Sequence, residues 1–206
     1  MNLLRPAAAA AALLLCACDV AQQNQSAPAA PAAEAASIAP ILTTADAADI
    51  HSFARPLEAR VHHLSLDLEV DFDAKRIGGT ASLDIDRKPD ARQIVLDSKG
   101  LEIESIADGS GKALAFTVGP ADPNLGSPLA VELRPDTRRL VIRYKSAPES
   151  GALQWLSPEQ TAGKTRPYLF SQGQAIENRT WIPTQDSPGI RQTWAATVPV
   201  PAGLPA

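Results

Sequence analysis

Two glutamines flank a glycine in the segment Gln172-Gly173-Gln174-Ala175. Gly173 has no side chain, so another group can approach the backbone closely at this position. The amide side chains of Gln172 and Gln174 donate and accept hydrogen bonds without adding charge. This combination can hold a polar ligand, and we take Gln172, Gly173, Gln174 and Ala175 as the candidate binding segment.

Residues that commonly bind metals do not form a recognisable site. The only histidines are His51, His62 and His63. Adjacent residues of a strand point to opposite faces, so His62 and His63 cannot share a metal ion without a bulge. No H-E-x-x-H pattern occurs in the sequence. We therefore predict no metal site and no self-contained catalytic site in this chain.

A second polar motif follows the candidate segment and reads Arg179-x-x-x-Pro183-x-x-Asp186-x-Pro188. The two prolines restrict the backbone on either side of Asp186. The Asp186 carboxylate can cap turn amides or pair with Arg179, which explains the motif without any ligand. We interpret these four residues as structural.

Short strands are the elements that must position these residues. Apolar and polar residues alternate over 63–73 and again over 80–86, and we expect a hairpin with its turn at 77–79. No amphipathic helix longer than a few turns can be drawn, so the fold class is all-β, an antiparallel β-sandwich or a saddle of packed sheets. Further strands are predicted at 93–96, 101–106, 113–118, 129–133, 140–144, 168–172 and 192–199.

Length and composition indicate one folded domain. The chain has 206 residues, of which 45% are hydrophobic and 20% charged. A net charge of −4 and a pI near 5.4 argue against a nucleic-acid partner, because such binding requires clustered cations. The folded part lacks cysteine, since Cys16 and Cys18 both lie near the N-terminus.

The N-terminus is typical of an export signal. Arg5 precedes an apolar run from Ala7 to Leu15, which is too short to span a bilayer. The following Leu15-Cys16-Ala17-Cys18 resembles a bacterial lipobox, with Cys18 as the lipidated residue. Lipidation at Cys16 and an ordinary secretory signal are the weaker alternatives. We expect a signal peptide at 1–17, an Ala/Pro-rich flexible tether at 18–49, and a folded domain at 50–206, exported and held at a membrane facing the periplasm.

Three stretches resemble the N-terminal domain of the M1 family of zinc aminopeptidases, which includes aminopeptidase N and the leukotriene hydrolases. The first is Arg55-Pro56 with the strand that begins at Ala59, and it resembles the opening strand of that domain. The second runs from Leu153 to Gln172 and is similar to the leukotriene hydrolase branch in particular. The third is the motif from Arg179 to Pro188, which is shared across the family.

This resemblance implies a function for the candidate segment. In the family this loop reaches the catalytic domain and holds the free amino end of a peptide, and Gln174 matches the glutamine of the leukotriene hydrolases. Gly173 departs from the family, where cysteine is frequent at its position. The complete enzyme would carry zinc, whereas this chain lacks both the H-E-x-x-H and the G-x-M-E-N motifs.

The sequence therefore predicts the N-terminal recognition domain of a zinc aminopeptidase, truncated at its C-terminus, whose catalytic domain is missing from the chain. Such an enzyme removes N-terminal residues from peptides, and zinc is not expected to bind this chain by itself. The alternative is a stand-alone, non-catalytic β-sandwich lipoprotein that binds a peptide or a protein partner.

Overall fold

The computed structural model describes residues 49–199. The predicted signal peptide, the lipidation site at Cys18 and the tether up to residue 48 lie outside the described residues. The described part is almost entirely β, as predicted, and its only helices are the 3-10 turns η2 (Pro158–Gln160) and η3 (Asn178–Thr180). Neither of these helices has the length and apolar character that crossing a membrane requires.

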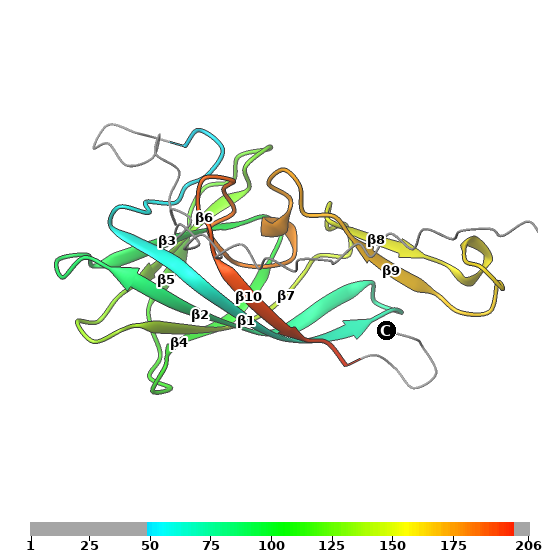
Figure 1. Ribbon diagram of the computed structural model, residues 1–206, viewed down its shortest axis with the longest axis horizontal. Coiled ribbons are helices and arrows are strands. Elements are labelled where there is room, and N and C mark those ends of the chain that lie inside the picture. Colours follow the sequence, from blue (N-terminus) through cyan, green and yellow to red (C-terminus); the bar gives the residue numbers. More distant parts are fainter. Residues whose placement is uncertain (1–48, 200–206) are drawn as a thin grey trace, which may run out of the picture. The chain divides into compact units, whose positions relative to one another are not determined.

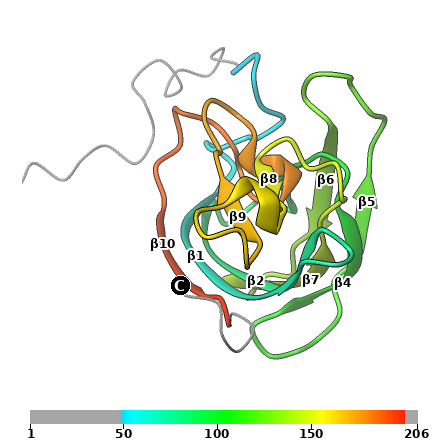
Figure 2. The same cartoon turned by 90° about the vertical axis from the view of Figure 1, so that its right-hand side faces the viewer.

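The largest sheet has five strands in the order β10-β1-β2-β7-β4. Figure 2 shows these strands following a curve, with β10 at one end and β4 at the other. Four of the strands pair in antiparallel fashion, whereas β10 runs parallel to β1 and so departs from the antiparallel expectation. The strands are β1 (Ala59–Asp71), β2 (Arg76–Arg87), β4 (Glu102–Asp108), β7 (Arg139–Lys145) and β10 (Thr193–Thr197).

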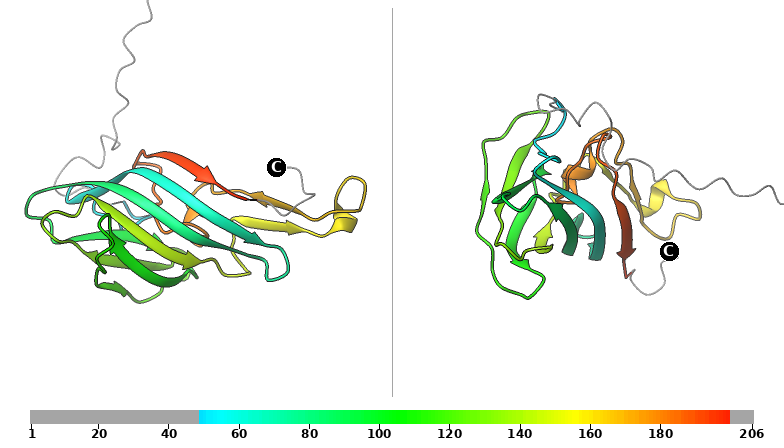
Figure 3. Two further views of the ribbon diagram at one scale, coloured as in Figure 1. Left: turned by 90° about the horizontal axis from the view of Figure 1, so that it is seen from below. Right: turned by 60° about the vertical axis from the view of Figure 1, so that its left-hand side comes forward.

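Two smaller antiparallel sheets complete the fold. One contains β3 (Gln93–Ser98), β6 (Ser127–Glu132) and β5 (Phe116–Val118) in that order. The other is a two-stranded ribbon of β8 (Leu153–Leu156) and β9 (Tyr168–Ser171). This ribbon extends away from the other strands in Figures 1 and 3, and its second strand leads directly into the candidate binding segment.

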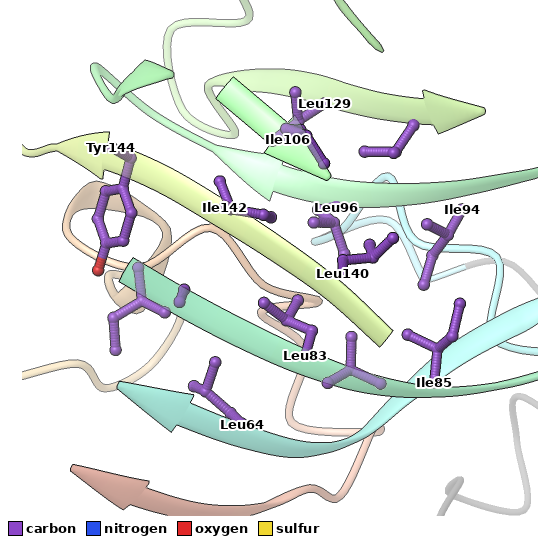
Figure 4. Packing of buried hydrophobic residues seen from close by; sticks show 14 of the residues in the cluster. Leu64, Leu83, Ile85, Ile94, Leu96, Ile106, Leu129, Leu140, Ile142 and Tyr144 are labelled. Carbon is purple, nitrogen blue, oxygen red and sulfur yellow. The ribbon is translucent and has the colours of Figure 1, made fainter. Parts of the chain in front are cut away.

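The five-stranded and three-stranded sheets share one hydrophobic core. Alternate residues of β1 and β2 point inward, as the sequence pattern predicts. Leu83 of β2 and Leu140 of β7 are fully buried together with Leu96 of β3 and Leu129 of β6. Figure 4 shows these side chains between the strands. Burial of this apolar surface fixes the two sheets against each other.

The predicted turn at 77–79 is wrong. The turn lies at 72–75, and Gly78 and Gly79 belong to β2, opposite Glu69 and Leu68 of β1. Gly79 has a φ of 142°, and a Cβ there would lie 2.2 Å from the backbone oxygen of Asp67. The glycines therefore mark a close approach between strands, which a glycine pair does not distinguish from a turn in sequence alone.

The remaining strands match the prediction closely, with one omission. The strand β8 was not predicted, because four residues give too short an alternation to be recognised without the partner strand. Its partner β9 covers all but the last residue of the strand expected at 168–172. The strand expected at 113–118 is shorter than predicted and begins at Phe116.

Candidate functional site

The candidate binding segment forms a turn directly after β9. The backbone N–H of Gln172 donates to the carbonyl of Ala152 at 2.8 Å, which continues the pairing of β9 with β8. The N–H of Glu177 then donates to the carbonyl of Gly173 at 2.9 Å and closes the turn. The peptide bond between Gln174 and Ala175 is cis. Gln174 and Ala175 are exposed at the tip of this turn.

An open depression of about 810 Å³ lies beside this turn. Gly173, Gln174 and Ala175 line one side, so the structure brings three of the four predicted residues together. Gln172, by contrast, is exposed but is not part of the lining. The other lining residues come from the chain that follows, and they are Asn178, Gln185, Asp186, Ser187, Pro188, Ile190, Arg191 and Gln192.

Arg179 fixes the backbone of this second group of residues through buried hydrogen bonds. Its side chain is fully buried. Its Nε lies 3.3 Å from Oδ2 of Asp186, and its backbone N–H donates to the same oxygen at 3.0 Å. The guanidinium also donates to the carbonyls of His51, Leu125 and Asp186 at 2.7–3.0 Å. The structural interpretation of Arg179 and Asp186 is therefore confirmed.

Asp97, at the end of β3, is the second buried acid of this anchor. Its carboxylate accepts hydrogen bonds from the Ser52 hydroxyl at 2.6 Å and from the N–H groups of Phe53 and Asp186 at 2.8 and 2.9 Å. Burial raises the pKa of Asp97, although these donors and the nearby Arg179 guanidinium oppose the shift. The side chain thus connects the chain at 52–53 to the motif that follows the binding segment.

Two of the three glutamines that line the depression, Gln174 and Gln185, differ in their environment. Gln185 is fully buried, and its Oε1 accepts from the N–H of Val61 at 2.9 Å. Its Nε2 donates to the carbonyls of Ala59 and Val95 at 3.0 and 3.3 Å. Gln174 is exposed. Gln185 is therefore committed to joining β1 to β3, while the Gln174 amide remains accessible to a ligand.

Sequence reasoning missed several lining residues. The sequence alone assigns no role to Asn178 or Arg191, and it places Gln192 in the strand expected at 192–199. Arg191 and Gln192 follow the turn at 188–189 and precede β10, whereas Asn178 lines the depression from the start of η3. The only signal in the sequence is the run of polar residues around Pro183 and Pro188, ahead of the strand expected at 192–199. This run does not indicate which side chains face outward.

The described residues do not fit a zinc ion, because no group of three histidine, cysteine, aspartate or glutamate side chains in 49–199 could hold a metal. The register does shift between Val61 and His63, so the bulge that the sequence analysis left open is present. His63 nevertheless hydrogen-bonds Thr193 at 2.7 Å and Ser65 at 3.1 Å, whereas His62 lies 3.3 Å from Asp86.

Comparison with known families gives one clear match. The Peptidase M1 N-terminal domain matches residues 60–204. Leukotriene A-4 hydrolase of Xenopus laevis is 39% identical over 163 residues, which cover 76% of this chain and 27% of that protein. Leucine aminopeptidase 2 of Yarrowia lipolytica is 36% identical over 146 residues, covering 67% of this chain and 22% of that protein. The chain thus spans about a quarter of the length of these relatives.

Solved structures agree with this match. Leukotriene A4 hydrolase from Saccharomyces cerevisiae superposes with a TM-score of 0.68 at 26% identity, over 76% of this chain and 26% of that chain. An M1 zinc metallopeptidase from Deinococcus radiodurans gives a TM-score of 0.50 at 20% identity, over 68% of this chain and 32% of the other. The second likeness supports the fold alone.

Proposed function

This chain belongs to the M1 peptidase family, because it matches the N-terminal domain of that family. We propose that it is the domain of a zinc aminopeptidase that recognises the free amino end of a peptide. The complete enzyme would remove N-terminal residues from peptides. The described residues do not fit the zinc ion, so we assign hydrolysis to a catalytic domain and recognition to this domain.

The observation that carries the proposal is the exposed Gln174 at the edge of a depression that is also lined by the buried residues Gln185 and Asp186. A peptide ammonium group offers three N–H donors and no acceptor. The Oε1 atom of Gln174 can accept one of these hydrogen bonds, and the neutral amide does so without a carboxylate's desolvation cost. The resemblance of Gln174 to the glutamine of the leukotriene hydrolases supports the same role.

The rigid base of the depression supports this role as well. Gln174 lies four residues before Asn178, where the chain enters the network of Arg179, Asp186 and Asp97. A side chain that binds a ligand loses less conformational freedom when its backbone is already fixed. The buried network therefore prepares the turn for binding.

We further propose that the protein is exported and anchored by lipid at Cys18, with the domain facing the periplasm. Several acyl chains on one cysteine would hold it durably, because each buried methylene contributes about 0.8 kcal/mol. The Ala/Pro-rich segment would then separate the domain from the membrane surface.

The test of recognition is a kinetic comparison on the native gene product, extracted from the membrane fraction and assayed with a peptide that has a free amine. Gln174→Ala is expected to raise KM by about tenfold. Gln154→Ala serves as the matched control, because Gln154 is also exposed but lies on β8. An unchanged KM and kcat in Gln174→Ala, or an equal effect of both variants, would contradict the proposal.

The intact mass of the same extract separates the two functional hypotheses. A mass far above that of this chain supports an aminopeptidase that contains a catalytic domain. A mass equal to residues 18–206 plus lipid supports the alternative, a non-catalytic lipoprotein that binds a peptide or a protein partner.

A further inference from the structure

Gly173 and Asn178 are five residues apart, and their contact determines how the candidate binding segment is held. We propose that Asn178 is a positioning residue for Gln174, and that Gly173 is required because Asn178 fills the space its side chain would occupy. This inference rests on the proposed function of Gln174. It adds a residue pair that neither the family match nor the sequence motifs point out.

The first step is the fit between the two residues. A Cβ atom at position 173 would lie 2.0 Å from Oδ1, 2.5 Å from Cγ and 2.7 Å from Nδ2 of Asn178. These distances are shorter than any real contact of this kind, so a side chain at 173 must displace the Asn178 amide. Gly173 is not among the residues with positive φ, and its backbone therefore tolerates alanine. The neighbouring asparagine therefore accounts for the glycine.

The second step is the orientation of the Asn178 amide. Its Oδ1 accepts a hydrogen bond from Nε1 of Trp181 at 3.3 Å, and its Nδ2 donates to Oδ1 of Asp186 at 3.3 Å. Rotating the amide by half a turn would direct donor toward donor and acceptor toward carboxylate. The positions of the oxygen and the nitrogen of the Asn178 amide are therefore fixed. The side chain joins the turn to the buried carboxylate of Asp186, which also binds Arg179.

The third step is the effect on Gln174. The segment 173–177 is closed by the hydrogen bond from the Glu177 N–H to the Gly173 carbonyl. The Asn178 side chain packs against the start of this segment, while its backbone carbonyl accepts from the N–H of Ile182 at 2.8 Å just beyond the end. Gln174 thus directly follows the residue against which the Asn178 side chain packs. Moving this side chain shifts the amide that would meet the peptide.

The structural test is a double-mutant cycle on the full chain. Gly173→Ala is expected to lower Tm by about 2–10 °C in the wild-type background, because the new methyl group overlaps Asn178. In the Asn178→Ala background the same change is expected to cost less than about 2 °C, because the methyl group enters emptied space. Additive effects of the two substitutions would overturn the inference.

Hydrogen exchange provides a local readout that overall destabilisation does not imitate. In Asn178→Ala the Glu177 amide is expected to exchange about tenfold faster, since the turn that it closes has lost its support. The Leu133 amide, which donates to Arg92 at 2.8 Å in another part of the fold, is the internal control. Asn178→Ser is a second variant in case the alanine protein does not fold. Equal acceleration at both amides, or none, would overturn the inference.

The functional readout separates this inference from the proposal on which it rests. On the native gene product, Asn178→Ala is expected to raise KM for the free-amine peptide by about threefold to tenfold with little change in kcat. If Gln174→Ala raises KM and Asn178→Ala does not, the positioning role is wrong while recognition stands. If Gln174→Ala changes nothing but the double-mutant cycle is non-additive, recognition fails and the residue pair is a structural device only.

Discussion

The segments 172–175 and 179–186 are separated by only three residues, yet they present their polar groups in opposite ways. In the first, Gln174 is exposed at the edge of a depression. In the second, the side chains of Arg179 and Gln185 are fully buried and hydrogen-bonded. Polar side chains in this part of the chain therefore have two functions, and burial distinguishes them. The buried set fixes the backbone, and the exposed set is available to a ligand.

The buried set also explains how distant parts of the sequence are brought together. Arg179 binds the carbonyls of His51 and Leu125, and Gln185 joins β1 to β3. The N–H of Asp97 donates to the Thr184 carbonyl at 2.7 Å, so the motif also covers the free edge of β3. An edge strand is a site for unwanted pairing, and this contact protects it.

The largest effect is predicted for Arg179→Ala. The substitution leaves the buried carboxylates of Asp97 and Asp186 without their cation, and breaking a buried pair from one side costs about 3–5 kcal/mol. Urea unfolding followed by circular dichroism measures the loss. Arg143→Ala is the control, because its ion pair with Glu104 is 3.8 Å long and exposed, and we expect a loss below about 0.5 kcal/mol there. Similar losses of stability in both variants would show that burial does not decide how much an ion pair contributes to stability.

A smaller loss is predicted for Gln185→Ala. Three hydrogen bonds disappear, and the backbone groups of Ala59, Val61 and Val95 lose their side-chain partner inside the fold. Unsatisfied buried polar groups cost about 1–3 kcal/mol. The same urea titration measures this change. If stability were unaffected, water would be replacing the amide and the buried set would be less rigid than the hydrogen bonds indicate.

The sequence predicts local features of the fold but not the contacts between distant segments. The alternation in β1 and β2 predicts the half-buried sheet, and the prolines around Asp186 predict a structural motif. Periodicity does not reveal that Gly79 lies inside a strand or that β10 pairs with β1 in parallel, because both depend on partners far away in the chain. The contact of Gly173 with Asn178 is missed for a similar reason, since a glycine looks alike whether a turn or a neighbour requires it.

A pH-dependent difference is predicted for Asp97→Asn. Because burial raises the native pKa of Asp97 above its ordinary value of 3.8, the carboxyl group contributes stability below that value and loses the contribution as pH rises through the native pKa. The variant does not titrate at this position. The wild-type advantage in unfolding free energy should therefore fall as pH is raised from about 3.5 toward neutrality. Parallel curves for the two proteins would mean that the Ser52, Phe53 and Asp186 donors offset the burial completely.

The smallest effect on stability is predicted for Gln174→Ala, the exposed counterpart of Gln185→Ala. Surface substitutions of this kind usually change the free energy of unfolding by less than about 0.5 kcal/mol. Both variants delete the same amide from the lining of the same depression, so their comparison isolates burial as the variable. If Gln174→Ala destabilised the domain as much as Gln185→Ala, the turn would be part of the scaffold. A stable Gln174→Ala protein makes any rise in KM attributable to recognition, because the structure that positions the turn is then unchanged.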